Sequence, residues 1–214
     1  MEPFRIHTGI VAPLDRTHVD TDQIMPKQFL KRIERTGFGA FLFYDWRYLP
    51  DGQPNPEFVL NRAPYRDATI LVTGRNFGCG SSREHAVWGL KDYGFRVIIA
   101  PSFAELFFGN CIRNGILPAT VDDAVAQDIM HRAHATPGYR LTVDLERQIL
   151  YDASGWEAPF TIDPVARERL LHGWDDIALT MRYADKIRAY EARRPTWLPR
   201  VQHAQPDDIS RASR

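Results

Sequence analysis

The alternation of apolar and polar residues predicts a strand-helix-strand-helix-strand order in the middle of the chain. Short apolar runs rich in β-branched side chains are typical of buried strands, and two longer segments have helix-forming composition and stop at or before glycine. In chain order, the expected strands are residues 68–72, 96–100 and 116–119, and the expected helices between them are residues 84–93 and 103–114. Successive βαβ units need parallel neighbouring strands, so this region predicts a parallel sheet.

Alternating patterns on either side of this region predict further strands. Residues 4–11 alternate before Pro13, where we expect the strand to give way to a loop. Residues 139–145 alternate strongly toward 148–151, as expected of an antiparallel hairpin. The sheet is therefore expected to be mixed, and the fold class α/β.

The remaining helices are expected in the second half of the chain, at residues 121–134, 163–172 and 174–193. The last has apolar residues at helical spacing, a stripe typical of a core or of a surface that meets a partner. Few apolar anchors follow. We expect a single domain with C-terminal helices over residues 1–197 and a disordered tail over residues 198–214.

Charge and composition narrow the range of partners. The 27 lysines and arginines equal the 27 aspartates and glutamates, so we expect small anionic ligands rather than nucleic acid or membrane. No apolar run approaches the roughly 20 residues that span a bilayer, and no signal-peptide pattern is present, so we expect a cytoplasmic protein. Cys79 and Cys111 do not suggest a disulfide framework. Two thiols are also too few for an iron–sulfur cluster, which another chain would have to bring.

The candidate chemistry is concentrated in residues 74–85, between a predicted strand and a predicted helix. The segment reads Gly-Arg-Asn-Phe-Gly-Cys-Gly-Ser-Ser-Arg-Glu-His. Such a turn favours anion binding, because glycine lets the backbone approach a ligand and the first N–H groups of a helix are unpaired. Arg83 adds a bidentate donor for a carboxylate or phosphate. Neither the phosphate-binding loop nor the dinucleotide motif is present.

The same residues allow a purely structural interpretation. Ser81 and Glu84 have the spacing of a capping box, in which Ser81 is the N-cap of the helix. Ser102 and Glu105 repeat that spacing before the next helix. From the spacing alone, helix capping and catalysis explain Ser81 equally well.

Two other segments carry charged residues that could serve the same site. Asp20 and Asp22 flank a threonine, a spacing more typical of turns and caps than of catalysis, and the rest of a calcium-loop pattern is missing. Arg32 and Arg35 belong to a basic cluster at residues 27–35, which forms either a solvated helix face or part of a dicarboxylate site. His85 is expected on a helix surface or in a cap rather than as a ligand.

Three separated segments resemble the small subunits of bacterial 3-isopropylmalate dehydratases and, more broadly, the C-terminal swivelling domain of aconitases. They are residues 19–30, 74–86 and 107–118, and the resemblance extends to about residue 190. It implies an aconitase-type swivelling domain with a barrel-like β core. It also implies that no cofactor is bound by this chain, because the four-iron four-sulfur cluster belongs to a large subunit, with which the chain forms a heterodimer or heterotetramer.

The activity implied by the resemblance is that of a hydro-lyase which works only with the large subunit. Such an enzyme interconverts 2- and 3-isopropylmalate through 2-isopropylmaleate in leucine biosynthesis. Ser81 matches the family's catalytic serine, whose alkoxide removes and returns a carbon-bound proton. Arg83 matches the arginine that binds a substrate carboxylate, and Ser82 lies beside them. Asp22 matches an aspartate that in aconitase supports a histidine of the cluster-bearing part.

Other positions are less specific, and two alternatives stay open. Arg32 and Arg35 are candidates for a further substrate arginine, and Met25, where aconitase has serine, fits an apolar substrate group. Within the class, the alternative is a related hydro-lyase for homocitrate or 2-methylmalate, that is, a homoaconitase or a citraconate dehydratase. Outside it, the alternative is a non-catalytic anion-binding assembly module, in which Ser81 only caps a helix.

Overall fold

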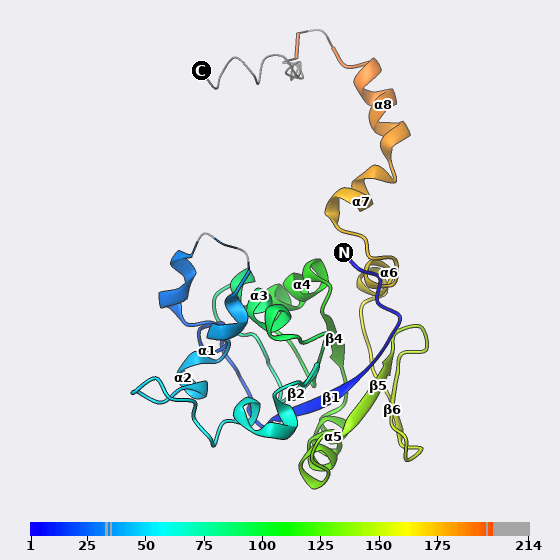
Figure 1. Cartoon of the computed structure of the whole chain (residues 1–214). Coiled ribbons are helices and arrows are strands. Elements are labelled where there is room, and N and C mark those ends of the chain that lie inside the picture. Colours follow the sequence, from blue (N-terminus) through cyan, green and yellow to red (C-terminus); the bar gives the residue numbers. More distant parts are fainter. Residues whose placement is uncertain (33, 35, 196, 199–214) are drawn as a thin grey trace. The chain divides into compact units, whose positions relative to one another are not determined.

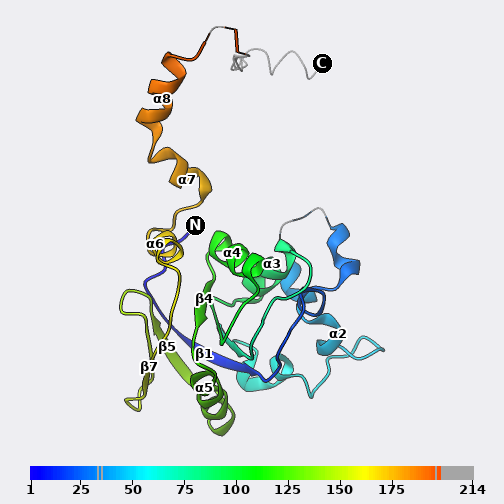
Figure 2. The same cartoon turned by 180° about the vertical axis from the view of Figure 1, so that it is seen from behind.

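The computed structural model describes residues 1–32, 34, 36–195, 197 and 198, and divides the chain into two compact units, Met1–Asp175 and Asp176–Arg214. The first unit is built around a seven-stranded sheet in the order β4-β3-β2-β1-β5-β6-β7 (Figures 1 and 2). Its strands are β1 (Ile6–Leu14), β2 (Ile70–Thr73), β3 (Val97–Ala100), β4 (Leu117–Thr120), β5 (Arg140–Asp144), β6 (Ile149–Tyr151) and β7 (Glu157–Pro159).

Strand β1 joins the parallel and antiparallel halves of this sheet. Its residues 11–14 pair in parallel with β2, and its residues 6–10 pair antiparallel with β5, which confirms the predicted mixed sheet. The expectation that the strand gives way to a loop at Pro13 is wrong, because β1 continues to Leu14. Pro13 lies beyond the part of β1 that pairs with β5, so its missing N–H leaves no gap in that ladder.

The two edges of the sheet approach each other through Thr120 and Thr161. Thr120 is the last residue of β4, and Thr161 follows β7. The N–H of Thr120 donates to the Thr161 carbonyl at 3.1 Å, and the N–H of Thr161 donates back to the Thr120 carbonyl at 2.7 Å. This bridge curls the sheet toward closure, as expected of a barrel-like β core.

Helices cover both faces of the parallel strands (Figures 1 and 2). Helices α3 (Glu84–Tyr93) and α4 (Glu105–Asn114) pack with Leu71 of β2 in one hydrophobic core, and α5 (Asp123–Ala135) packs with Ile70 in another. Strand β2 is buried on both faces, as is typical of a parallel sheet between helices. The predicted helix ends are confirmed: α3 and α4 end at Gly94 and Gly115, which adopt the left-handed conformation that glycine favours.

A long connection of short helices links β1 to β2. It contains α1 (Thr21–Ile24), η1 (Lys27–Lys31), η2 (Phe38–Phe41), α2 (Tyr44–Arg47), η3 (Val59–Asn61) and η4 (Ala63–Tyr65). Met25 follows α1 and is fully buried in the core beside α3. A Cβ on Gly89 of α3 would come within 2.5 Å of the Met25 Cε. The interpretation of Met25 as the contact for an apolar substrate group is therefore wrong, since its side chain fills the core.

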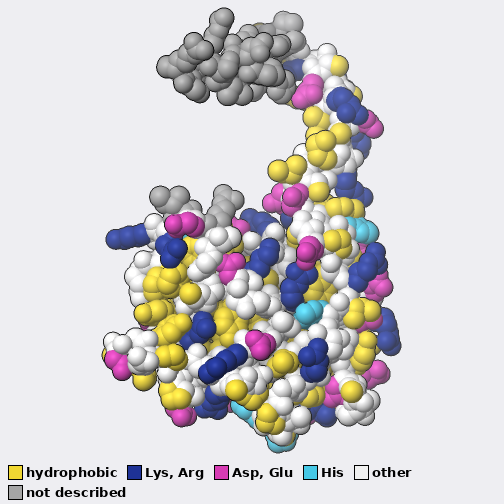
Figure 3. Space-filling view, in the orientation of Figure 1, with side chains coloured by type: hydrophobic (Ala, Val, Ile, Leu, Met, Phe, Trp, Pro, Cys, Tyr) yellow, Lys and Arg dark blue, Asp and Glu magenta, His cyan; other side chains and the backbone are white. Residues whose placement is uncertain are grey.

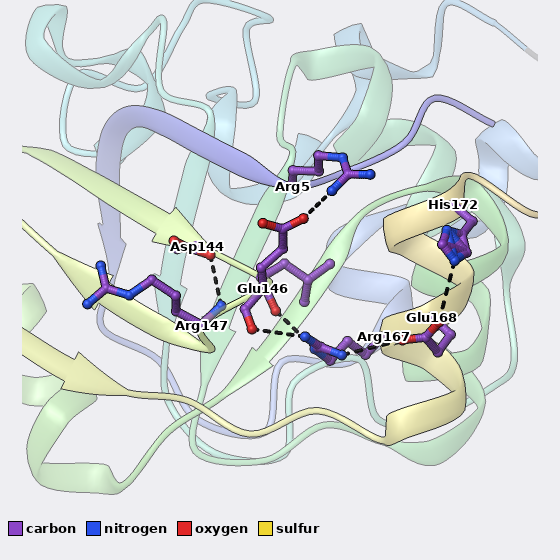
Figure 4. A network of polar contacts seen from close by, with 8 residues as sticks. Arg5, Asp144, Glu146, Arg147, Arg167, Glu168 and His172 are labelled. Carbon is purple, nitrogen blue, oxygen red and sulfur yellow. Dashed lines mark hydrogen bonds and ion pairs between the residues drawn. The ribbon is translucent and has the colours of Figure 1, made fainter.

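Helix α6 (Pro164–His172) begins and ends as predicted from the sequence. The Asp163 side chain caps it by accepting a hydrogen bond from the Ala166 N–H at 2.9 Å, and Gly173 ends it. Arg167 anchors α6 to the turn between β5 and β6, donating to the carbonyls of Leu145 at 3.1 Å and Glu146 at 2.9 Å (Figure 4).

The second unit contains α7 (Asp176–Met181) and α8 (Ala184–Ala192). The single helix predicted over residues 174–193 is wrong, because Tyr183 is the N-cap of a separate α8. No residue of α7 or α8 is buried. That residues 1–197 form one domain stays a prediction, and of the predicted tail, residues 198–214, only Leu198 is described.

The described surface shows no broad field of one charge on the face drawn in Figure 3, where acidic and basic side chains are interspersed. None of the described helices combines the length and apolar character needed to cross a membrane. The cytoplasmic location stays a prediction.

Candidate functional site

Residues 74–83 connect β2 to α3 at the carboxyl ends of the parallel strands, where ligands bind in sheets of this kind. Backbone hydrogen bonds fix this loop from two sides. The Gly78 N–H donates to the carbonyl of Val19, which follows β1, at 2.8 Å. The Phe77 N–H donates to the carbonyl of Ser102, which follows β3, at 3.1 Å. Three segments far apart in the sequence thus meet at the carboxyl ends of the parallel strands.

The glycines of this loop allow close packing within the protein. Gly78 and Gly80 have φ angles of 77° and 85°, in the left-handed region that glycine favours. A Cβ on Gly78 would overlap the Phe107 ring, and a Cβ on Gly80 would overlap the Asp20 carboxylate. We expected these glycines to let the backbone approach a ligand. That explanation is wrong, because the groups that approach Gly78 and Gly80 closely are side chains of this chain.

Ser81 does not cap α3. The N-cap is Arg83, whose backbone is extended with φ of −132°, and no side chain makes a capping hydrogen bond. Glu84 is the first helical residue, and its carboxylate accepts a hydrogen bond from the Asn114 amide at 3.1 Å. The capping-box interpretation of Ser81 is therefore wrong. The Ser81 and Ser82 residues are exposed.

The spacing of Ser102 and Glu105 also predicts a capping box, and that prediction is wrong. Ala104 is the N-cap of α4, and no side chain caps that helix. The Ser102 hydroxyl instead accepts a hydrogen bond from the Asn76 N–H at 2.8 Å. Asn76 has a left-handed φ of 58°, so the serine holds a strained residue of the site loop.

Asp20 has the capping role predicted for it. It is the N-cap of α1, where its carboxylate accepts a hydrogen bond from the Asp22 N–H at 2.6 Å. The Gln23 side chain accepts from the Asp20 N–H at 3.0 Å and completes a capping box. The first residue of α1, Thr21, donates its hydroxyl hydrogen to the Ser81 carbonyl at 2.7 Å. The start of α1 is therefore fixed against the site loop.

Arg83 and Asp22 form an ion pair beside the exposed serines. The Arg83 side chain is 11% exposed, and the Lys27 ammonium lies 3.4 Å from the second Asp22 oxygen. A guanidinium has five N–H donors, so Arg83 can hold Asp22 and still offer donors to a substrate carboxylate. The structure thus brings together Ser81, Ser82, Arg83 and Asp22 of the predicted site residues.

Arg32, another of the predicted site residues, is not brought into this group. Arg32 lies 3.5 Å from the Glu34 carboxylate and 5.0 Å from the centroid of the Phe41 ring. Arg35 lies outside the described residues. His85 packs edge-on against the Phe38 ring at 5.3 Å, so it has a packing role on α3.

Sequence reasoning missed Thr21, His18 and Asn76. The His18 ring and the Asn76 amide are hydrogen-bonded at 2.9 Å, and both residues have left-handed φ angles, 54° and 58°. Asparagine is enriched in that conformation, which is the one signal in the sequence for Asn76. Nothing in the sequence distinguishes Thr21 from a threonine in an ordinary helix start.

The thiols of the chain are free and favour their protonated forms. Burial, and secondly the Asp20 carboxylate, raise the pKa of the Cys79 thiol. Burial also raises the pKa of Cys111 well above its ordinary value. Among the described residues, no three histidine, cysteine, aspartate or glutamate side chains are grouped so that they could hold a metal ion. This part of the chain does not fit an iron–sulfur cluster.

Three family models match consecutive parts of the sequence. The aconitase C-terminal domain matches residues 1–124, LeuD_N matches residues 127–164, and the C-terminal domain of the 3-isopropylmalate dehydratase small subunit matches residues 176–204. A 3-isopropylmalate dehydratase small subunit from Brevibacillus brevis is 57% identical over 194 residues, which cover 91% of this chain and 100% of that protein. The chain belongs to the 3-isopropylmalate dehydratase small-subunit family.

Two further proteins support the assignment to the small-subunit family and its fold. The protein of the same name from Geobacillus kaustophilus is 59% identical over 193 residues, covering 90% of this chain and 98% of that protein. A crystal structure of 3-isopropylmalate dehydratase from Methanocaldococcus jannaschii has a TM-score of 0.64 at 24% identity, covering 86% of this chain and 99% of that one, which supports the fold. The family, fold class and hydro-lyase class predicted from the sequence are confirmed.

Proposed function

We propose that this chain is the small subunit of an enzyme that interconverts 2- and 3-isopropylmalate, and that Ser81 is its base. The observation that carries the proposal is the position of Ser81. It is an exposed serine, two residues before a largely buried arginine, on a loop fixed at the carboxyl ends of the parallel strands. Because Ser81 has no role in capping α3, the structural alternative for this residue loses its basis.

The surroundings favour a negatively charged base. A serine alkoxide is a very strong base, so it needs nearby positive charge to form. The N-terminus of α3 begins three residues after Ser81 and carries the positive end of the helix dipole. Arg83 would bind one substrate carboxylate through two parallel N–H···O bonds, and Ser82 would donate a hydrogen bond beside it.

Asp22 orients the Arg83 guanidinium through their ion pair. Because Asp22 is partly exposed, it is also open to a group from a partner, in keeping with the role implied by the resemblance. Arg32 and Arg35 remain candidates for the second substrate carboxylate. Arg32 would have to exchange its contact with Glu34 for that carboxylate.

The arrangement has a base and a carboxylate clamp on an open surface. We therefore propose that the site is completed by a cluster-bearing large subunit, in a heterodimer or heterotetramer. A four-iron four-sulfur cluster on that partner would supply a Lewis acid for the leaving hydroxyl. The present chain would bind the substrate through Arg83, remove the proton from carbon at the Ser81 oxygen, and return it to the neighbouring carbon of the bound 2-isopropylmaleate. The hydroxyl lost from that neighbouring carbon would add to the carbon that had lost its proton, which balances the isomerisation.

The test is the Ser81→Ala variant, purified as a complex with the large subunit from the same source. Turnover of 3-isopropylmalate is expected to fall about a thousandfold, because general-base catalysis contributes that much. Assembly should be unchanged, since the Ser81 contact within the chain is made by its backbone carbonyl. Retained turnover in the assembled variant would contradict the proposal.

Two comparisons sharpen this test. Ser82→Ala is a matched variant at the neighbouring exposed serine, and it is expected to raise KM more than it lowers kcat. Parallel assays with homocitrate and 2-methylmalate separate the proposed substrate from those of the related hydro-lyases. A higher kcat/KM for either compound would reassign the substrate while leaving the role of Ser81 in place.

A further inference from the structure

Thr21 contacts the site loop on both sides of Gly80. Its backbone N–H donates to the Cys79 carbonyl at 2.9 Å, and its hydroxyl donates to the Ser81 carbonyl at 2.7 Å. Thr21 is 1% exposed, so the donor groups of both hydrogen bonds are shielded from water. Two contacts from one residue thus fix the loop at the carbonyl groups of the two residues that flank a left-handed glycine.

The hydrogen bond to the Ser81 carbonyl matters because this part of the loop is outside any helix or strand. Gly80 has a left-handed φ, and the helical ladder of α3 begins only at Glu84. The Ser81 side chain is itself exposed. The direction of that side chain therefore depends on how its own backbone is held.

We infer that Thr21 is a positioning residue for Ser81. This inference rests on the proposed function, in which the Ser81 oxygen is the base. A base acts only within hydrogen-bond reach of the proton that it removes, and a shift of about 1 Å can cost about a hundredfold in rate. By fixing the Ser81 carbonyl, the Thr21 hydroxyl holds the serine oxygen at a set place relative to Arg83.

Helix α1 contacts both of the proposed functional residues, Ser81 and Arg83. Thr21 holds Ser81, and the next residue, Asp22, pairs with Arg83. One short helix therefore fixes the base and the carboxylate clamp together.

Thr73, the last residue of β2, provides a matched control near the same loop. It is 0% exposed, and its hydroxyl donates to the Arg16 carbonyl at 3.1 Å. Like Thr21, it is a buried threonine with a hydroxyl bonded to a backbone carbonyl, but that carbonyl does not belong to a proposed site residue. Replacing either threonine by valine removes the same type of hydrogen bond.

The experiment compares Thr21→Val, Thr21→Ser and Thr73→Val, each in the complex with the large subunit. Per mole of assembled complex, Thr21→Val is expected to lower kcat about ten- to a hundredfold with KM within about twofold. Thr21→Ser keeps the hydroxyl and should stay within about threefold of the parent kcat. Thr73→Val should lower Tm by a similar amount to Thr21→Val but keep kcat within about twofold.

Further variants keep the two proposals separate. If Thr21→Val does not assemble, Thr21→Ala is compared with Thr21→Ser, a pair that differs only in the hydroxyl group. Equal kcat values within that pair would overturn the positioning role. An equal decrease in kcat for Thr73→Val and Thr21→Val would overturn it as well. If Ser81→Ala is inactive while Thr21→Val turns over normally, the positioning role fails and the proposed function stands. If Ser81→Ala retains turnover, the proposed function fails.

Discussion

Arg83 and Asp22 are paired across two short stretches of chain, one before α3 and one in α1. The Arg83 side chain is 11% exposed and that of Asp22 is 36% exposed, so the cation is the more deeply buried partner. A buried cation without a counter-charge is costly, and the carboxylate offsets that cost before any substrate arrives. The pair therefore fixes the guanidinium in a defined orientation in the free subunit.

Asp22→Asn is expected to destabilise the chain by removing this counter-charge. The expected loss in the free energy of unfolding is about 1.5–3 kcal/mol, the range for a hydrogen bond to a charged group. Urea unfolding measures it. Glu57→Gln is the control, because the Arg62–Glu57 pair is well exposed and such pairs contribute about 0–1 kcal/mol. Equal losses in the two variants would show that Asp22 does not compensate a buried charge.

Arg83→Lys is expected to weaken substrate binding more than folding. Lysine keeps the positive charge but lacks the planar pair of donors that matches a carboxylate. KM for isopropylmalate should rise about tenfold, and the complex should still form. Steady-state kinetics of the assembled enzyme provide the measurement, and an unchanged KM would argue against Arg83 as the clamp.

Gly80→Ala is expected to impair both folding and turnover. Gly80 has a left-handed φ of 85°, and a Cβ there would overlap the Asp20 carboxylate. Gly52→Ala is the matched control, because Gly52 has nearly the same φ, 83°, with nothing within 4 Å of its added Cβ. The control should lose about 1 kcal/mol from backbone strain alone. Gly80→Ala should lose more and also lower kcat, since the displaced loop carries Ser81.

Local signals in the sequence predicted the ends of helices well. Gly94, Gly115 and Gly173 end α3, α4 and α6 because a left-handed residue is needed there and only nearby backbone is involved. The capping boxes predicted at Ser81 and Ser102 are absent for the opposite reason. The Ser102 carbonyl accepts a hydrogen bond from the Phe77 N–H, and the Ser102 hydroxyl accepts one from the Asn76 N–H, so hydrogen bonds to residues distant in the sequence override the local preference.

The sequence predicted only some of the residues of the candidate site. Motif and resemblance singled out Ser81, Arg83 and Asp22, and the structure places the latter two in contact. The contact between Thr21 and Ser81 joins residues 60 apart in the sequence, and no local pattern encodes such a distance. Residue identity alone also could not show that Met25 points into the core.

The stability of Ser81→Ala distinguishes a base from a helix cap. Loss of an N-cap side chain costs about 0.5–2 kcal/mol, whereas the Ser81 side chain makes no capping bond. Its unfolding free energy should therefore match that of the parent within about 0.5 kcal/mol. Asp163→Ala is the positive control, because Asp163 does cap α6, and it should lose about 1 kcal/mol. A comparable loss in Ser81→Ala would restore the capping role.

His7 is expected to make the stability of the chain depend on pH. Its Nε2 is hydrogen-bonded to the Thr69 hydroxyl at 2.7 Å, and burial, followed by the charges of Arg96 and Arg140, lowers its pKa from the ordinary value of 6.5. Between the lowered folded pKa and 6.5, the unfolded chain binds more protons than the folded one, so stability rises with pH in that window. The contribution is complete above 6.5 and is lost as the pH falls through the folded pKa.

The His7→Gln variant isolates this contribution from the other titrating groups. Glutamine does not titrate in this range but can still bond to the Thr69 hydroxyl. Urea midpoints at about pH 7.5 and about pH 5 should show a larger loss of stability on acidification for the parent than for the variant, because only the parent must protonate a partly buried imidazole. An equal loss in both proteins would show that His7 titrates as it does in the unfolded chain. A smaller loss in the parent would mean that the fold stabilises the imidazolium despite the two neighbouring arginines.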